Sequence, residues 1–146
     1  MSFFKSMNVS ASGMTAERMR MDVLSRNIAN ANTTRTAAGT PYRRQVAVVR
    51  QITSNQFESM LNQRTGNQSS GNGVEVVAVV EDQAPFKMVY NPGHPDADQE
   101  GYVLMPNVDT VTEMINMISA TRAYEANVTS LNSAKGMAMK ALDIGR

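Results

Sequence analysis

The sequence predicts an α+β fold in which a long helix at each terminus flanks a small β-rich middle segment. Apolar residues recur at helical spacing near both ends, and valine-rich runs occupy the middle of the chain. A polar, glycine-containing stretch separates two of these runs. The predicted divisions are residues 1–33, 34–107 and 108–146, and the terminal helices are predicted to form a coiled-coil-like bundle in an assembly.

The N-terminal helix is predicted over residues 2–31. Met7, Met14, Met21 and Ile28 fall at intervals of seven, as in a heptad seam. Ser2 is a suitable N-cap residue. The run then meets an asparagine-rich stretch at 26–36, and asparagine favours helix ends and turns because its amide competes for backbone groups.

The middle segment changes to the composition of β-strands. Residues 42–52, 73–82 and 86–90 are rich in valine and predict three strands. Residues 53–73 predict a long flexible loop, with one short helical turn around 57–61. Residues 90–101 predict a turn region from their Pro and Gly content.

The C-terminal helix is predicted over residues 108–143. Asn107 or Asp109 can cap its start after Pro106. Its apolar positions are Val111, Met114, Ile118, Tyr124, Val128, Leu131, Ala134, Ala138 and Leu142.

Composition limits the classes of protein that this chain can be. The 146 residues include 12 Met but only four Phe, four Tyr and no Trp, so a compact core is poorly supplied with aromatic bulk. Cysteine is absent, which removes disulfides and thiolate chemistry. The first residues lack the apolar run of a secretory signal, and no stretch approaches the length needed to span a bilayer.

Charge is distributed unevenly along the chain. Residues 1–50 hold eight Lys and Arg against two acidic residues, a net +6, whereas residues 75–109 hold one Lys against seven Asp and Glu, a net −6. Complementary contacts between subunits are one explanation, and differently charged solvated faces are the other. Nucleic acid binding is not indicated, because the basic residues lack interleaved aromatics.

An acidic turn is the main candidate for chemistry. His94, Asp96, Asp98, Glu100 and Gly101 resemble half of a calcium-binding loop, but the loop lacks the closing glutamate. A metal-dependent or peptidoglycan-cleaving enzyme built on residues 96–100 is therefore the alternative function. The sequence contains no nucleophile elbow, P-loop or dinucleotide motif, and we predict no catalytic residue, metal site or cofactor.

The middle segment is too small to cover the apolar stripes of both terminal helices. Three short strands cannot cover the apolar stripes of two long helices, because so small a segment seldom supplies more than a few kcal/mol of core stability. The helices must therefore pack against each other or against other chains. A soluble coiled-coil adaptor that forms a small oligomer is a third alternative.

Several stretches resemble one known family. "LSRNIANANTT", residues 24–34, resembles the signature of the flagellar rod, hook and hook-associated axial proteins. "PYRRQVAVV", "VYNPGHPDADQEGYVLMPNVD" and "MINMISATRAYEANVTSLNSAK" resemble a member from the proximal rod. The resemblance implies a structural subunit of the periplasmic rod, exported without signal cleavage by the flagellar type III apparatus, that transmits motor torque to the hook.

The resemblance also implies partners and interfaces. The partners would be the rod proteins FlgB, FlgF and FlgG, the export-gate adaptor FliE and further copies of the chain, and the terminal helices would form the inner layers of the tube. The sequence leaves open whether the 53–73 loop faces the bushing ring, the peptidoglycan or another rod subunit. We predict that Asn27 and Asn30 end the first helix and bond a neighbouring chain, with a purely local helix cap as the alternative. The predicted interface comprises Met7, Met14, Met21, Leu24, Asn27, Ile28, Asn30, Met114, Ile118, Arg122, Tyr124, Asn127, Val128 and Leu131.

Overall fold

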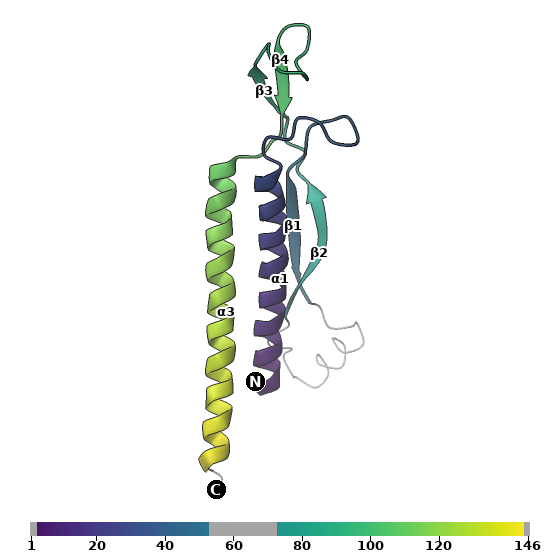
Figure 1. Cartoon of the computed structure of the whole chain (residues 1–146). Coiled ribbons are helices and arrows are strands. Elements are labelled where there is room, and N and C mark those ends of the chain that lie inside the picture. The colour runs from purple at the N-terminus through teal and green to yellow at the C-terminus, as the bar shows by residue number, and fades with distance from the viewer. Residues whose placement is uncertain (1–2, 53–72, 145–146) are drawn as a thin grey trace, which may run out of the picture. The chain divides into compact units, whose positions relative to one another are not determined.

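The computed structural model describes residues 3–52 and 73–144 and confirms the α+β class. In chain order the elements are α1 (Phe3–Ala29), β1 (Gln45–Gln51), β2 (Val74–Glu81), β3 (Lys87–Tyr90), β4 (Tyr102–Met105) and α3 (Thr110–Ile144) (Figure 1). The predicted helical turn around 57–61 lies outside the described residues. None of the described helices is long and apolar enough to cross a membrane.

The chain divides into two compact units that each combine distant segments. Unit 1 comprises Met1–Met19, Val49–Val77 and Ala120–Arg146, and unit 2 comprises Arg20–Val48 and Ala78–Ser119. Each helix therefore contributes one part to each unit. Strand β1 pairs with β2, and the bonds Ile52 N–H to Gly73 O and Asp82 N–H to Arg44 O flank this antiparallel pair.

Unit 2 contains the larger buried side chains among the described residues. Val23, Leu24, Val103 and Val108 are buried there. In unit 1 the buried apolar side chains among the described residues are alanines, at positions 16, 120 and 134. The two units therefore differ sharply in the apolar core that each can build.

Strand β4 is a feature that the sequence analysis missed. It pairs antiparallel with β3 in the register Lys87 to Met105 and Tyr90 to Tyr102, and the two tyrosine rings make an edge contact with centroids 5.4 Å apart. The strand has only four residues between Gly101 and Pro106, which is too short for alternation to be recognised. Its partner and the preceding turn stabilise it instead.

Gly101 shapes the turn that enters β4. Its φ is +83°, and a Cβ at this position would lie 2.9 Å from Tyr90 Cε2. We expect Gly101→Ala to destabilise the hairpin by about 1–3 kcal/mol, since it adds backbone strain and a steric clash. Urea unfolding followed by circular dichroism would measure this. Gly93→Ala is the matched control, because its nearest neighbour would lie at 3.8 Å, and an equal loss in both variants would contradict the prediction.

The helix ends follow local hydrogen-bonding rules. The Asn30 side chain lies just past α1 and donates from Nδ2 to Arg26 O at 2.9 Å. Asp109 caps α3 as predicted, and its carboxylate accepts a hydrogen bond from the Thr112 hydroxyl. This bond lowers the pKa of Asp109 below its usual value, with Lys87 and nearby backbone N–H groups contributing.

Candidate functional site

Asn27 is the centre of a buried polar network in unit 2. Its side chain is 0% exposed although its type is usually found at the surface. Nδ2 donates to Gln45 O and to Glu113 Oε2, both at 2.8 Å. Oδ1 accepts from Tyr42 Oη–H at 3.0 Å and from Gln45 N–H at 2.9 Å. Both donors and both acceptor sites of the amide are thus used within the chain.

The Asn27 amide takes the place of a neighbouring strand at the start of β1. Its oxygen and nitrogen bond the N–H and the C=O of the same residue, Gln45, as a paired backbone would. The Gln45 N–H and C=O also determine the orientation of the Asn27 amide. In a flipped amide the Asn27 NH2 group would face the Gln45 N–H, and two donors cannot bond each other. A residue near the end of α1 therefore determines where β1 begins.

Glu113 carries a carboxylate that is 1% exposed. Its Oε2 accepts from Asn27, and its Oε1 accepts from Arg44 Nε at 2.9 Å and lies 2.8 Å from Arg44 Nη2. Arg44 also reaches Asp82, with Nη1 3.3 Å from Oδ2. A buried carboxylate is tolerated only when it is paired and hydrogen-bonded, and both conditions hold here.

A second asparagine completes the network at the same end of the β1–β2 pair, where β1 begins and β2 ends. Asn107 accepts from Arg44 N–H at 2.8 Å and donates to the carbonyls of Asp82 and Ala84, both at 3.2 Å. It therefore joins the last residue before β1 to the first residues after β2. The name "Asn27 network" is used below for Asn27, Tyr42, Arg44, Gln45, Asp82, Asn107 and Glu113.

The surroundings shift the pKa values of three members of the network. Burial raises the pKa of Tyr42, so its hydroxyl remains a donor to Asn27. Burial alone would lower the pKa of Arg44, but its bonds to Glu113 and Asp82 raise it, so the guanidinium stays charged. The hydrogen bond from Ala84 N–H, aided by Arg44, lowers the pKa of Asp82. Every shift favours the protonation state that the hydrogen bonds require.

The part of α1 in unit 1 is tied to β2 and to α3 by smaller contacts. Ser12 Oγ accepts from Val74 N–H at 3.1 Å and donates to Val9 O at 2.7 Å. Asn127 lies against Gly13: a Cβ added to Gly13 would lie 3.0 Å from Nδ2 of Asn127. The Asn127 side chain packs against α1 of its own chain, and its predicted contact with a neighbouring chain stays a prediction.

The predicted interface residues fall into three groups by exposure. Leu24 and Asn27 are buried within the chain. Met114, Ile118 and Arg122 are exposed on α3. The remaining predicted positions are half-buried; they are Met7, Met14, Met21, Ile28, Asn30, Tyr124, Asn127, Val128 and Leu131.

We predicted that the amides of Asn27 and Asn30 bond a neighbouring chain. In the structure both amides bond their own chain, and the bond from Asn30 to a neighbouring chain stays a prediction. Asn30 makes the local helix cap that was the alternative. Asn27 does neither, because it joins α1 to β1 and to α3, and its hydrogen-bonding capacity is already filled.

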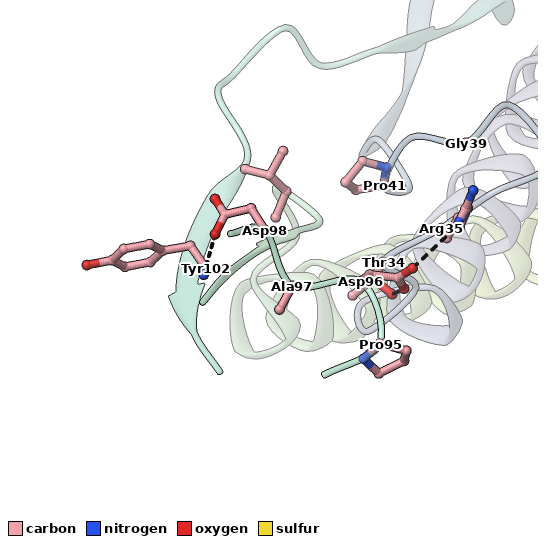
Figure 2. A pocket seen from close by; sticks show the side chains of 10 residues that line it. Thr34, Arg35, Gly39, Pro41, Pro95, Asp96, Ala97, Asp98 and Tyr102 are labelled. Atoms are coloured by element: carbon pink, nitrogen blue, oxygen red, sulfur yellow. Dashed lines mark hydrogen bonds and ion pairs between the residues drawn. The ribbon is translucent and has the colours of Figure 1, made fainter. Parts of the chain in front are cut away.

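The acidic turn is built as a structural turn. Asp98 Oδ1 accepts from Glu100 N–H and Tyr102 N–H, at 3.0 and 2.8 Å. Asp96 accepts from the Thr34 hydroxyl at 2.8 Å and lies 3.6 Å from Arg35 Nη1. Figure 2 shows these side chains around a pocket of about 330 Å³, with Asp98 bonded to Tyr102 and Asp96 to Arg35. Across residues 3–52 and 73–144 no three His, Asp or Glu side chains gather as metal ligands would.

Part of the charge asymmetry is used inside the chain. Arg44 pairs with Asp82, Arg35 with Asp96, and Arg50 with Glu75 at 2.8 Å. Each pair joins the basic first segment to the acidic middle segment. Contacts between subunits are therefore not needed to explain these charges, although they were the sharper prediction.

Sequence analysis did not identify Tyr42, Arg44, Gln45 or Glu113 as members of a site. Glu113 is in the first turn of α3, where an acidic residue is common for reasons of helix polarity alone. One signal was available: Glu113 falls on the helix face opposite to Val111, Ile115 and Ile118. A lone carboxylate facing away from the apolar stripe does not reveal which face is buried.

Comparisons with known proteins identify the family. Residues 7–35 match the family of flagella basal body rod proteins, and residues 99–144 match the C-terminal family of flagellar basal body rod FlgEFG proteins. The flagellar basal-body rod protein FlgC of Bacillus subtilis is 51% identical over 100% of both chains. FlgC of Borreliella burgdorferi is 45% identical over 99% of this chain and 98% of its own, and FlgC of Salmonella typhimurium is 42% identical over 95% of each. The chain therefore belongs to the FlgC family of flagellar basal-body rod proteins.

Proposed function

We propose that the chain is a structural subunit of the proximal rod that transmits motor torque to the hook. Family membership makes it a rod protein rather than an enzyme, and rod proteins assemble with copies of themselves and with other rod components. The proposed specific partners are FlgB, FlgF, FlgG and FliE, and the proposed location is the periplasmic rod, reached without signal cleavage. The terminal segments 1–33 and 108–146 would supply the inner layers of the helical tube.

The observation that carries the assembly proposal is an uncovered apolar stripe on α3. Val111, Met114, Ile115 and Ile118 follow the spacing of one helix face and are 65%, 50%, 62% and 55% exposed. Buried Glu113 lies on the opposite face, so the stripe points away from the network in unit 2. A soluble chain seldom leaves such a stripe uncovered unless another molecule binds it.

The buried network gives the subunit a rigid support for this stripe. Asn27 and Glu113 join α1 and α3 through a bond between residues 86 positions apart. A buried polar contact resists sliding of one helix along another, because any shift leaves its groups without partners. In a shaft that carries torque, such resistance is the property required of each subunit.

The enzyme alternative based on residues 96–100 is not supported. The carboxylates of Asp96 and Asp98 are occupied by Thr34, Arg35 and backbone amides, which hold the turn in place. The family is one of rod proteins.

Ile118→Asp tests the assembly proposal. Burying an Ile side chain contributes about 1.5–3 kcal/mol, so replacing it by a charge should reduce incorporation into the rod by about tenfold or more. The measurement is the amount of chain in purified basal bodies from flagellated cells that lack their own FlgC.

Ile118→Leu is the matched control at the same position, because it keeps the apolar surface and favours helix. It should incorporate normally, and circular dichroism should show the same folded content for both variants. Normal incorporation of Ile118→Asp would show that the stripe is not an assembly surface.

A further inference from the structure

We propose that the outer face of the β3–β4 hairpin of one copy packs on the exposed α3 stripe of a second copy. The outer hairpin face comprises Met88, Tyr90, Tyr102 and Leu104. The α3 stripe comprises Val111, Met114, Ile115 and Ile118. The proposed contact rests on the rod function, because only an assembly brings copies together, and it identifies the surface that covers the stripe.

The register of the hairpin places the four residues of the outer hairpin face on one side. Met88 lies opposite Leu104, and two residues further along Tyr90 lies opposite Tyr102. Residues directly opposite one another, and residues two apart on one strand, share a face of an antiparallel pair. Val103, between two of these residues on β4, points to the other face and is 2% exposed in the core of unit 2. The outer hairpin face therefore points away from this core.

The outer hairpin face is apolar although it is exposed. The exposed fractions of its four residues lie between 37% and 64%. An antiparallel sheet that buries one face normally carries polar side chains on the other. Four apolar or aromatic side chains gathered on such a face indicate a surface that another molecule covers.

The outer hairpin face and the α3 stripe suit one another as the two sides of a single contact. Both lack charged side chains, and an apolar helix stripe on an apolar sheet face is a standard layer of protein architecture. The two surfaces lie on different elements, so a contact between them leaves each copy with one further surface to offer. Such head-to-tail contacts continue from copy to copy into rings or helical filaments, whereas stripe-to-stripe pairing would close at two copies. The head-to-tail contact is therefore the one compatible with a helical rod.

Charges beside the two surfaces are complementary. Glu100 is exposed two residues before Tyr102, at the tyrosine end of the outer hairpin face. Arg122 is exposed one helical turn after Ile118, in line with the α3 stripe. Within residues 3–52 and 73–144 neither Glu100 nor Arg122 has an ion-pair partner. Docking the tyrosine end against the Ile118 end brings the two charges together and selects one orientation of the contact.

The size of the contact determines where it has to be tested. Four side chains on each partner are far fewer than the roughly 20–30 residues a side of a standard stable interface. The contact should therefore not hold two free chains together, and it forms where other rod contacts already bring copies close. The test consequently uses basal bodies.

Disulfide trapping between two copies tests the contact, because the unaltered chain contains no cysteine. Tyr90→Cys and Ile115→Cys, each with a different tag, are produced together in flagellated cells that lack their own FlgC. After mild oxidation of purified basal bodies, we expect a disulfide-linked pair that carries both tags. A disulfide requires Cβ atoms about 3.5–4.5 Å apart, so its formation reports direct contact.

Val89→Cys is the matched control for Tyr90→Cys. Val89 is the next residue on β3, is 47% exposed and points to the other face of the hairpin. Its mixed disulfide with Ile115→Cys should form with a yield about tenfold or more below that of Tyr90→Cys. An equal yield from the control, or no mixed disulfide in basal bodies that contain Tyr90→Cys and Ile115→Cys, would overturn the proposal.

Charge reversal supplies a readout that leaves both apolar surfaces intact. Glu100→Lys and Arg122→Glu should each lower incorporation into the rod by about twofold to fivefold, as expected for an exposed ion pair. The double variant restores the pair with its signs exchanged, so its incorporation should return to within about twofold of the unaltered chain. No loss in the single variants, or no recovery in the double variant, counts against the contact.

Ile118→Asp separates failure of this contact from failure of the assembly proposal. Normal incorporation of Ile118→Asp would show that the α3 stripe is not an assembly surface, and both proposals would fall. Exclusion of Ile118→Asp from the rod, together with absence of the mixed disulfide, would overturn only the hairpin contact. A different molecule would then cover the stripe.

Discussion

Asn27→Ala is expected to lower the free energy of unfolding of unit 2 by about 3 kcal/mol, because it leaves several polar groups without partners. Glu113 Oε2 and the backbone of Gln45 lose their bonds to the amide, and Tyr42 loses its acceptor. Each buried polar group left unsatisfied costs about 1–3 kcal/mol. Tyr42 and Gln45 are only half-buried, so water relieves part of the cost at those positions.

Asn30→Ala is the matched control in the same motif. Its amide makes a local, solvent-exposed hydrogen bond to Arg26 O, so we expect a loss of about 0.5–1 kcal/mol. Urea denaturation of both variants, followed by circular dichroism, measures the difference. Equal losses would show that the Asn27 network does not stabilise unit 2.

Asn27→Ala also distinguishes two explanations of a defect in rod assembly. If Asn27 acted between chains, as the sequence suggested, Asn27→Ala would impair incorporation while leaving the free chain as stable as the unaltered protein. Because its amide is filled within the chain, we expect stability of the free chain to fall first. Incorporation should fall only as a consequence.

Local patterns predicted the elements of this fold well. The heptad of Met7, Met14, Met21 and Ile28 marked α1, the valine-rich runs marked β1 to β3, and Asp109 marked the start of α3. Each of these signals lies within a few residues of the element it predicts. Strand β4 lacked such a signal, because its four residues depend on pairing with β3 and on the turn at Gly101.

Partners distant in the sequence could not be predicted in the same way. The asparagine cluster attracted attention to Asn27, but nothing near it indicates Gln45 or Glu113. The same limit applies to Val111, Met114 and Ile118, which a helical pattern marks as an apolar face without showing whether the chain itself covers it. In the structure these three side chains are exposed, so the chain itself does not cover them. The opposite face of α3, which carries Glu113, is the face that is buried.

Glu113→Ala is expected to destabilise unit 2 by about 3 kcal/mol. Removing one partner of a buried ion pair costs about 3–5 kcal/mol, because the remaining groups stay desolvated. The Arg44 side chain is 24% exposed, so water can solvate part of its charge and the lower end of this range applies. Asn27 Nδ2 remains buried and loses an acceptor.

A double-mutant cycle separates the pair from other effects of truncation. The set is Glu113→Ala, Arg44→Ala and the double variant, with free energies of unfolding from urea denaturation. We expect a coupling energy of about 1.5–3 kcal/mol, the range for hydrogen bonds to charged groups. Arg44 also pairs with Asp82. Arg44→Ala removes both ion pairs, so it should cost more than loss of the Glu113 contact alone. A coupling energy near zero would mean that Glu113 contributes through helix packing, and the network would then lose its electrostatic basis.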